Sequence, residues 1–157
     1  MALLSVDDLS FAYRDRTVLS RISFSVDAGE VLGLVGPNGC GKTTLIKCVD
    51  GMLSPQEGKV VLGGRDLGGM HRREVARAMA YVPQSAGNQT ASTVFETVLM
   101  GRRPYLNWTV SPGDEERVAA ALDLLDLGGL AFRKVAELSG GERQRVMIAR
   151  ALVQETG

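Results

Sequence analysis

The stretch that decides the fold is Gly36-Pro-Asn-Gly-Cys-Gly-Lys-Thr-Thr44. It matches the phosphate-loop pattern G-x-x-x-x-G-K-[ST], with Lys42 and Thr43 at the last two fixed positions. Its glycines allow a tight turn that points backbone N–H groups at a polyphosphate. The lysine adds positive charge, and the threonine hydroxyl can bind Mg²⁺. We expect a helix over Lys42–Asp50, whose N-terminus also favours an anion.

The residues just before this loop, Glu30-Val-Leu-Gly-Leu-Val35, form a short apolar run. Such a run is typical of a buried parallel strand. The order strand, glycine loop, helix favours a phosphate loop over a chance match in a glycine-rich turn. It predicts an α/β fold with a P-loop NTPase core built on a parallel sheet.

Composition narrows the function classes. The 157 residues suffice for one domain, and 18 Lys+Arg balance 18 Asp+Glu, so nothing indicates a general nucleic-acid or anionic-membrane binder. No apolar run is long enough to cross a bilayer, and the start lacks the order of a signal peptide, so we expect a cytosolic chain. Two cysteines, Cys40 and Cys48, are too few for a disulfide framework or a zinc site. Cys40 lies at a helix N-terminus, which favours alkylation.

The rest of the chain alternates strand-like and helix-like patterns. An antiparallel β region is expected at the front, and a helical insert from about Thr93 to Leu127. A run of apolar residues ending in Asp123 resembles a metal-binding strand, but its three alanines favour helix. The polar stretch Ser85–Ala91 and the glycine- and proline-containing stretch Gly101–Gly113 are expected to be irregular. The predicted strands are Leu3–Tyr13, Val18–Val26, Lys59–Leu62 and Tyr81–Gln84, and the predicted helices are Arg72–Ala80, Thr93–Met100 and Asp114–Leu127.

A second motif, Leu138-Ser-Gly-Gly-Glu-Arg-Gln-Arg145, opens the last predicted helix. Ser139 and Glu142 have the spacing of a capping box, as do Thr93 and Glu96. Two glycines remove side chains from the first turn, so the helix N-terminus offers a second anion site. The alternative is a simple helix cap, which needs neither the glycines nor the Gln and Arg that follow.

These residues resemble the ATP-binding subunits of ABC transporters. Leu138–Glu142 looks like the family's signature motif, and Tyr81–Gln84 looks like its Q-loop. Phe11-Ala-Tyr13 is similar to the segment that supplies an adenine-stacking aromatic. From local residues alone Tyr13 is an ordinary strand-end tyrosine, and the resemblance favours the stacking role. The residues that the resemblance assigns to ATP are Tyr13, Gly36, Pro37, Asn38, Gly39, Cys40, Gly41, Lys42, Thr43 and Thr44.

The resemblance also implies cofactors and partners. ATP with Mg²⁺ would lie between two subunits paired head to tail, each closing its signature residues Leu138, Ser139, Gly140, Gly141 and Glu142 over the partner's nucleotide. Lys42, Gln84 and Ser139 would carry the catalytic roles, with Thr43 and Gln84 at the metal. Transmembrane permease subunits would hold the pair at the cytoplasmic face of the membrane, and no nucleic acid is expected.

The segment Val94–Tyr105 is similar to the helical insert of importers for iron–siderophores, haem and cobalamin. It favours a metal-chelate importer. The alternative is a soluble ABC-type ATPase acting in DNA repair or translation, which would be expected to carry a coiled-coil insert or a tandem domain. An adenylate- or GTP-type P-loop enzyme leaves the signature unexplained.

The resemblance divides the chain near residue 90, into a β region with the P-loop core and a helical subdomain over about 91–157. In the family three further elements follow the signature helix: a strand ending in an Mg²⁺-organising Asp, a general-base Glu and a switch His. None follows here, because Glu155 is the sole acid after the signature and His71 lies in the wrong segment. We therefore expect these elements beyond Gly157 and no ATP hydrolysis by residues 1–157 alone.

Overall fold

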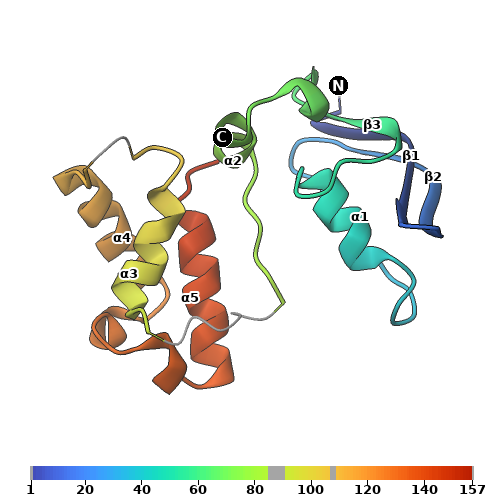
Figure 1. Ribbon diagram of the computed structural model, residues 1–157. Helices are drawn as coiled ribbons and strands as arrows, with labels where there is room; N and C mark the ends of the chain where they lie inside the picture. The colour runs from blue at the N-terminus through green and yellow to red at the C-terminus, as the bar shows by residue number, and fades with distance from the viewer. Residues whose placement is uncertain (1, 85–90, 107–108, 157) are drawn as a thin grey trace. The chain divides into compact units, whose positions relative to one another are not determined.

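The computed structural model describes residues 2–84, 91–106 and 109–156. The chain forms two compact units, Met1–Val75 and Ala76–Gly157, which we call the N-terminal and C-terminal units (Figure 1). We describe each unit by itself. The boundary near residue 90 separates the subdomains that the family resemblance implies. It is a different boundary from the one between these two units, and it stays a prediction.

The N-terminal unit contains an antiparallel sheet, as the alternating patterns predicted. Its strand order is β2-β1-β3-β4. The turn between the first two strands is tight, and Arg14 adopts a left-handed conformation there with φ 51°. The strands are β1 (Leu4–Tyr13), β2 (Arg16–Val26), β3 (Glu57–Leu62) and β4 (Arg65–Asp66).

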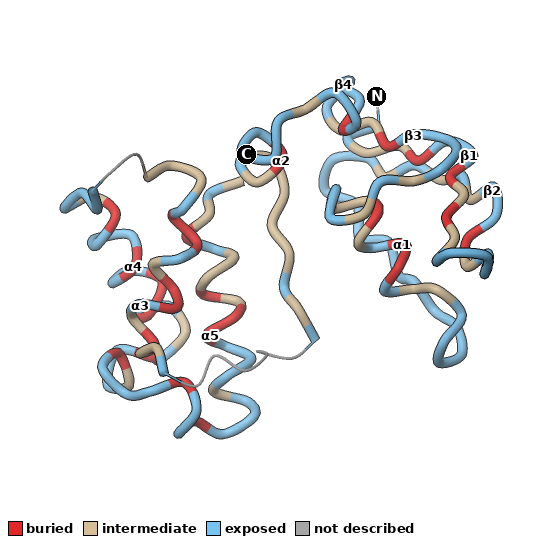
Figure 2. The backbone as a smooth tube through the Cα atoms, in the orientation of Figure 1, coloured by how far each residue is buried: buried red, intermediate tan, exposed pale blue. Residues whose placement is uncertain are grey.

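Helix α1 (Lys42–Val49) supplies part of the core of this unit (Figure 2). Apolar side chains from the strands and the helix are shielded from water, which is the main favourable contribution to folding. A short 3₁₀ turn, η1 (Leu67–Gly69), and helix α2 (Arg72–Ala78) follow the sheet. The most buried apolar side chains are Val6, Leu9, Leu19, Leu45, Cys48 and Val60.

The prediction of a strand at Glu30–Val35 is wrong for this structure. The segment has no regular secondary structure, and Val31 and Val35 are each 94% exposed. A parallel strand is stable when it pairs with a neighbouring strand and both faces of its sheet are covered. The four described strands of this unit pair with one another in the antiparallel sheet instead. The predicted short strand at Tyr81–Gln84 is also absent, since these residues pair with no described strand.

The C-terminal unit is a cluster of helices around one core, with α3, α4 and α5 packed against one another (Figure 1). Its α-helices are α3 (Val94–Leu99), α4 (Pro112–Leu124) and α5 (Gly140–Leu152). Three 3₁₀ turns connect them: η2 (Met100–Arg102), η3 (Gly128–Leu130) and η4 (Val135–Glu137). The core consists of Val94, Val98, Val118, Ala121, Leu122, Leu127, Ala131, Val135, Leu138, Val146, Met147, Ala149 and Val153.

Helix α4 begins at Pro112 rather than at Asp114. Ser111 is its N-cap, Pro112 occupies the first turn, and Asp114 completes a capping box. Proline suits this position because its missing N–H would have no partner there in any case. The stretch that ends at Asp123 lies inside this helix, so the helical interpretation is confirmed. The polar loop predicted over Ser85–Ala91 falls almost entirely outside the described residues.

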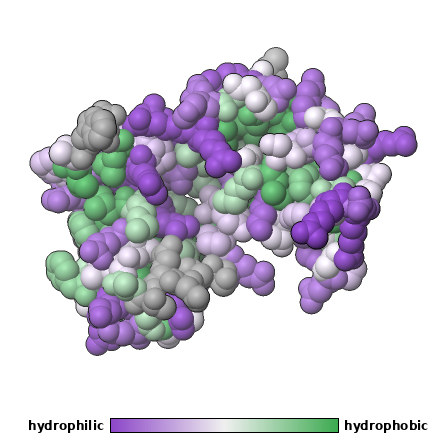
Figure 3. All heavy atoms as spheres, in the orientation of Figure 1, coloured by the Kyte–Doolittle hydropathy of each residue, from purple (hydrophilic) through white to green (hydrophobic). Residues whose placement is uncertain are grey.

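The face seen in Figure 3 carries both hydrophilic and hydrophobic side chains. In the C-terminal unit, Phe132 is 87% exposed and Leu124 is 72% exposed. Scattered apolar side chains of this kind are normal on a protein surface. Within the described ranges, no helix is both long enough and apolar enough to span a bilayer.

Candidate functional site

The phosphate-loop segment is held against the sheet at Gly41. This residue has φ 101°, which favours glycine, and a Cβ there would lie 3.0 Å from Leu19 Cδ2 and 3.1 Å from Val18 Cγ1. A larger residue would therefore be strained and would press against β2. The residues of the loop before it, through Cys40, are all exposed to solvent. The glycine thus brings an accessible loop to the start of α1.

The start of α1 lacks the side-chain cap that α3, α4 and α5 have. Its N-cap is Gly41, which has no side chain to accept a hydrogen bond from the first-turn amides. In contrast, α3, α4 and α5 each begin with a capping box. Amides of an uncapped first turn need another acceptor, and an anion such as phosphate suits both them and the helix dipole.

Lys42 folds back over the loop. Its Nζ donates hydrogen bonds to the carbonyl oxygens of Gly36 and Pro37, each at 2.7 Å, and lies 3.7 Å from Cys40 Sγ. The ammonium is thereby fixed beside the exposed loop, at the end of the helix where a phosphate would bind. A lysine ammonium forms strong charge-assisted hydrogen bonds with phosphate oxygens, which suits Lys42 to this position.

The residues after the lysine differ in accessibility. Thr43 is exposed and Thr44 is buried. Only the exposed hydroxyl is open to a metal ion from solvent, which fits the predicted role of Thr43 at Mg²⁺. Within the described residues, no group of three or more His, Cys, Asp and Glu side chains could hold a metal ion by itself. Nucleotide phosphate oxygens and water could supply further ligands to a magnesium ion at this hydroxyl.

Tyr13 lies at the end of β1 and is 47% exposed. Its ring meets that of Phe11 edge to face, with centroids 4.9 Å apart and planes at 81°. This contact fixes the tyrosine ring while about half of its surface stays open. An exposed, fixed aromatic ring suits base stacking, and that role for Tyr13 stays a prediction.

The capping box predicted at the start of α5 is confirmed. Ser139 Oγ accepts a hydrogen bond from the Glu142 amide at 3.3 Å, and Glu142 Oε2 accepts one from the Ser139 amide at 2.7 Å. Hydrogen bonds from the Ser139 side chain and the Ser139 amide lower the pKa of the Glu142 carboxyl, because they favour its charged form. Ser139 is exposed, so its hydroxyl can also reach a group outside the chain.

The two glycines of this motif are not required by the fold. A Cβ built on Gly140 or Gly141 would have no atom within 4 Å, and neither residue has positive φ. Alanine would fit both positions and has the higher helix propensity. Both positions are therefore open to the approach of a group from outside this chain.

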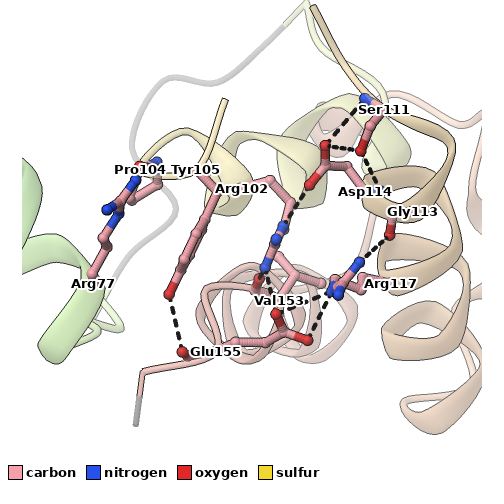
Figure 4. A network of polar contacts seen from close by, with 10 residues as sticks. All are labelled: Arg77, Arg102, Pro104, Tyr105, Ser111, Gly113, Asp114, Arg117, Val153 and Glu155. Carbon is pink, nitrogen blue, oxygen red and sulfur yellow. Dashed lines mark hydrogen bonds and ion pairs between the residues drawn. The ribbon is translucent and has the colours of Figure 1, made fainter. Parts of the chain in front are cut away.

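The sequence does not predict an ion-pair network that lies at the C-terminal end of the signature helix (Figure 4). Arg102 is 5% exposed, and its guanidinium bonds to Asp114 Oδ1 at 2.9 Å and to Glu155 Oε2 at 2.8 Å. Bonds from Ser111 and Arg102 lower the pKa of the Asp114 carboxyl to about 2. The sequence signal was weak, because Arg102 lies in a stretch that was expected to be irregular.

The predicted site residues fall into both units. Lys42, Thr43 and Tyr13 belong to the N-terminal unit, whereas Ser139 and Gln84 belong to the C-terminal unit. Gln84 is exposed and directly precedes the residues that the structure leaves undescribed. Each half of the predicted site is therefore described separately, and their joint geometry stays a prediction.

Comparison with known proteins identifies relatives along almost the whole chain. The chain is 46% identical over 156 residues to an uncharacterized ABC transporter ATP-binding protein of Methanocaldococcus jannaschii, covering 99% of this chain and 61% of that protein. It is 39% identical over 158 residues to an ATP-binding protein of Bacillus subtilis named for a siderophore transport system, covering 99% and 58%. The chain thus spans about 60% of the length of these curated relatives.

A solved structure agrees with these relatives. The crystal structure of a nucleotide-free ATP-binding cassette from an ABC transporter matches with a TM-score of 0.86 and 30% identity, covering 98% of this chain and 66% of the other. The family described as ABC transporter matches residues 19–157, which include both the phosphate loop and the signature motif. The chain therefore belongs to the ABC transporter family, and the relatives described above are ATP-binding proteins of that family.

Proposed function

We propose that the whole protein is the ATP-binding subunit of a membrane transporter and hydrolyses ATP to drive transport. The observation that carries this proposal is the uncapped start of α1 with Lys42 fixed beside it. Amides without a side-chain cap, a helix dipole and an ammonium all converge on one exposed loop. Together they favour binding of the phosphates of a nucleotide.

A second subunit would complete the ATP site. The capped start of α5 presents Ser139, together with two glycines that the fold does not require. Such a surface can approach the γ-phosphate held by the phosphate loop of another copy. Thr43 and Gln84 would bind the Mg²⁺ that accompanies the nucleotide, and Tyr13 would stack on the adenine.

We propose a metal chelate such as an iron–siderophore as the cargo. The support is the siderophore-transport name of the Bacillus subtilis relative and the insert at Val94–Tyr105. The partners would be permease subunits, with this protein at the cytoplasmic face of the membrane. The alternative, a soluble ATPase in DNA repair or translation, has no counterpart in the names of the relatives described above.

Residues 1–157 alone are expected to bind ATP without turning it over. The only acid that follows the signature motif is Glu155, and its carboxylate is already bonded to Arg102 and Arg117. Desolvation raises the pKa of Glu155, but the hydrogen bonds and charges of Arg102 and Arg117 together outweigh it, so the pKa is lowered and the carboxylate is a weaker proton acceptor. Its role in this structure is therefore that of an ion-pair partner rather than a general base.

The experiment that tests nucleotide binding is an ATP titration of Lys42→Ala by calorimetry. Each charge-assisted bond to phosphate contributes roughly 1.5–3 kcal/mol, so we expect affinity to fall by at least about tenfold. Lys47→Ala, which removes a lysine from the far end of the same helix, is the matched control and should bind as the wild type does. Equal ATP affinity in Lys42→Ala and wild type would contradict the proposal.

A further inference from the structure

The three residues that follow α5, Val153–Glu155, bond to segments from three different parts of the C-terminal unit. We call them the exit segment. The Val153 carbonyl accepts a hydrogen bond from Arg102 Nη1 at 2.8 Å. The Gln154 side chain donates to the carbonyl oxygens of Ala76 and Met79, the latter at 2.8 Å. Three consecutive residues therefore tie the end of the signature helix to η2 and to the residues around the end of α2.

Glu155 makes the largest number of these contacts. Its carboxylate accepts from Arg102 at 2.8 Å and from Arg117 Nε at 2.9 and 3.0 Å. Its carbonyl accepts from the Tyr105 hydroxyl at 3.1 Å. Figure 4 shows the two arginines approaching this carboxylate from η2 and α4. The helical insert is thus bonded to the exit segment mainly through one residue.

The two carboxylates around Arg102 differ in exposure. The Asp114 side chain is 10% exposed, whereas that of Glu155 is 50% exposed. If Glu155 moved away, Arg102 would keep its bonds to Asp114 and Val153, so no buried charge would lose all its partners. The freed Glu155 carboxylate would be hydrated, which makes its separation inexpensive. Arg102 therefore forms a buried ion pair with Asp114 that stays in place and a more exposed ion pair with Glu155 that can separate.

The backbone at Glu155 also favours separation. This residue has φ 45°, a left-handed conformation that is uncommon for a residue with a Cβ. The conformation persists because surrounding contacts hold it. Once the carboxylate separates from the arginines, the backbone can return to an ordinary conformation.

We propose that Gln154 and Glu155 form a releasable contact between the end of the signature helix and the helical insert, with Glu155 as the detachable residue and Arg102–Asp114 as the fixed anchor. In the attached state Glu155 holds this end of the chain against η2 and α4. In the released state Gln154 and Glu155 separate, while Val153 and the rest of the helical core stay packed. This device goes beyond the proposed function, and its test does not depend on nucleotide binding.

The test is hydrogen exchange measured by mass spectrometry on the full chain, comparing wild type with Glu155→Gln. The amides of Gln154 and Glu155 bond to the carbonyls of Ala151 and Leu152, so their exchange reports on release. Loss of the two ion pairs should raise exchange in the exit segment and in residues 102–106 by roughly three- to tenfold. Exchange within α3 and the buried part of α5 should not change.

The matched control is Glu116→Gln, which removes the same charge from an exposed position on α4. It should leave exchange in the exit segment as in the wild type. Raising salt to about 1 M should make the wild type resemble Glu155→Gln, since exposed pairs are screened.

Two results would contradict the proposal of a releasable contact. One is unchanged exchange in the exit segment of Glu155→Gln. The other is an equal increase throughout α3, α4 and α5, which would make the network a general stabiliser of the unit. Asp114→Asn provides a second variant, because it removes the fixed anchor and should accelerate exchange across the whole unit rather than in the exit segment alone.

Discussion

The two motifs that identify this chain lie in different structural surroundings. The signature motif begins a helix that is capped by its own side chains and packed on a continuous core. The phosphate-loop motif follows a stretch, Glu30–Val35, that is exposed and pairs with no described strand. A capping box needs only neighbours in sequence, whereas a parallel strand needs partners from elsewhere. Sequence patterns therefore specify the first kind of element more completely than the second.

The largest expected effect concerns the packing of α5. Gly101 approaches α5 so closely that an added Cβ would collide with the Arg150 carbonyl oxygen and lie 2.6 Å from Val153 Cγ2. Gly101→Ala should therefore lower the free energy of unfolding by roughly 2–4 kcal/mol. Gly129→Ala is the matched control, because a Cβ at Gly129 meets no atom within 4 Å. Urea unfolding followed by circular dichroism measures both, and equal stabilities would contradict the close packing of α5.

The next prediction applies one substitution beside each motif. Val146 is 0% exposed in α5, and Val35 is 94% exposed before the phosphate loop. Val146→Ala should cost roughly 1.5–3 kcal/mol of stability through lost burial and a cavity. Val35→Ala should stay within about 0.5 kcal/mol. A large loss from Val35→Ala in the same unfolding assay would show that Glu30–Val35 packs against something in solution.

The two units should also respond to acid in opposite ways. Burial raises the pKa of Asp50, at the end of α1, to about 6, so its proton is held more tightly in the folded state. Stability of the N-terminal unit should rise as pH falls from about 6 to about 4. The pKa of Asp114 is lowered instead. Its contribution to the stability of the C-terminal unit is therefore lost as pH falls from about 4 towards 2.

Asp50→Asn isolates the first of these effects. Removing the buried charge should stabilise the N-terminal unit at pH 7 by about 1–2 kcal/mol and abolish its gain on acidification. Hydrogen exchange at pH 5 and 7, corrected for intrinsic rates, measures the change in α1. A destabilised Asp50→Asn at pH 7 would mean that the carboxylate has a stabilising partner.

Much of the fold follows from the sequence, and the exceptions have physical reasons. The capping boxes at Thr93 and Ser139 are local, and both are confirmed. The start of α4 was placed at Asp114 because the role of Ser111 as its N-cap was overlooked. The strand at Glu30–Val35 was predicted from its composition, but strand formation depends on pairing that composition cannot supply.

The candidate site shows the same difference between local and long-range features. The lysine, glycines and threonines of the phosphate loop were identifiable because their chemistry requires a fixed spacing. The contacts of Arg102 join residues far apart in the chain, such as Asp114 and Glu155, and no periodic pattern marks them. Long-range polar networks of this kind become visible only once the helices are packed.

We propose that the phosphate loop of one copy and the signature cap of another form one ATP site. The direct test mixes Lys42→Ala and Ser139→Arg subunits of the whole protein with a non-hydrolysable ATP analogue, and measures pairing by analytical ultracentrifugation. Neither variant should pair alone, because each lacks one half of every site, whereas the mixture should form a one-to-one pair with one intact site. Circular dichroism checks that both variants are folded, since loss of the serine cap costs only about 1 kcal/mol. Nucleotide-dependent pairing of Ser139→Arg alone, or no pairing in the mixture, would contradict the account.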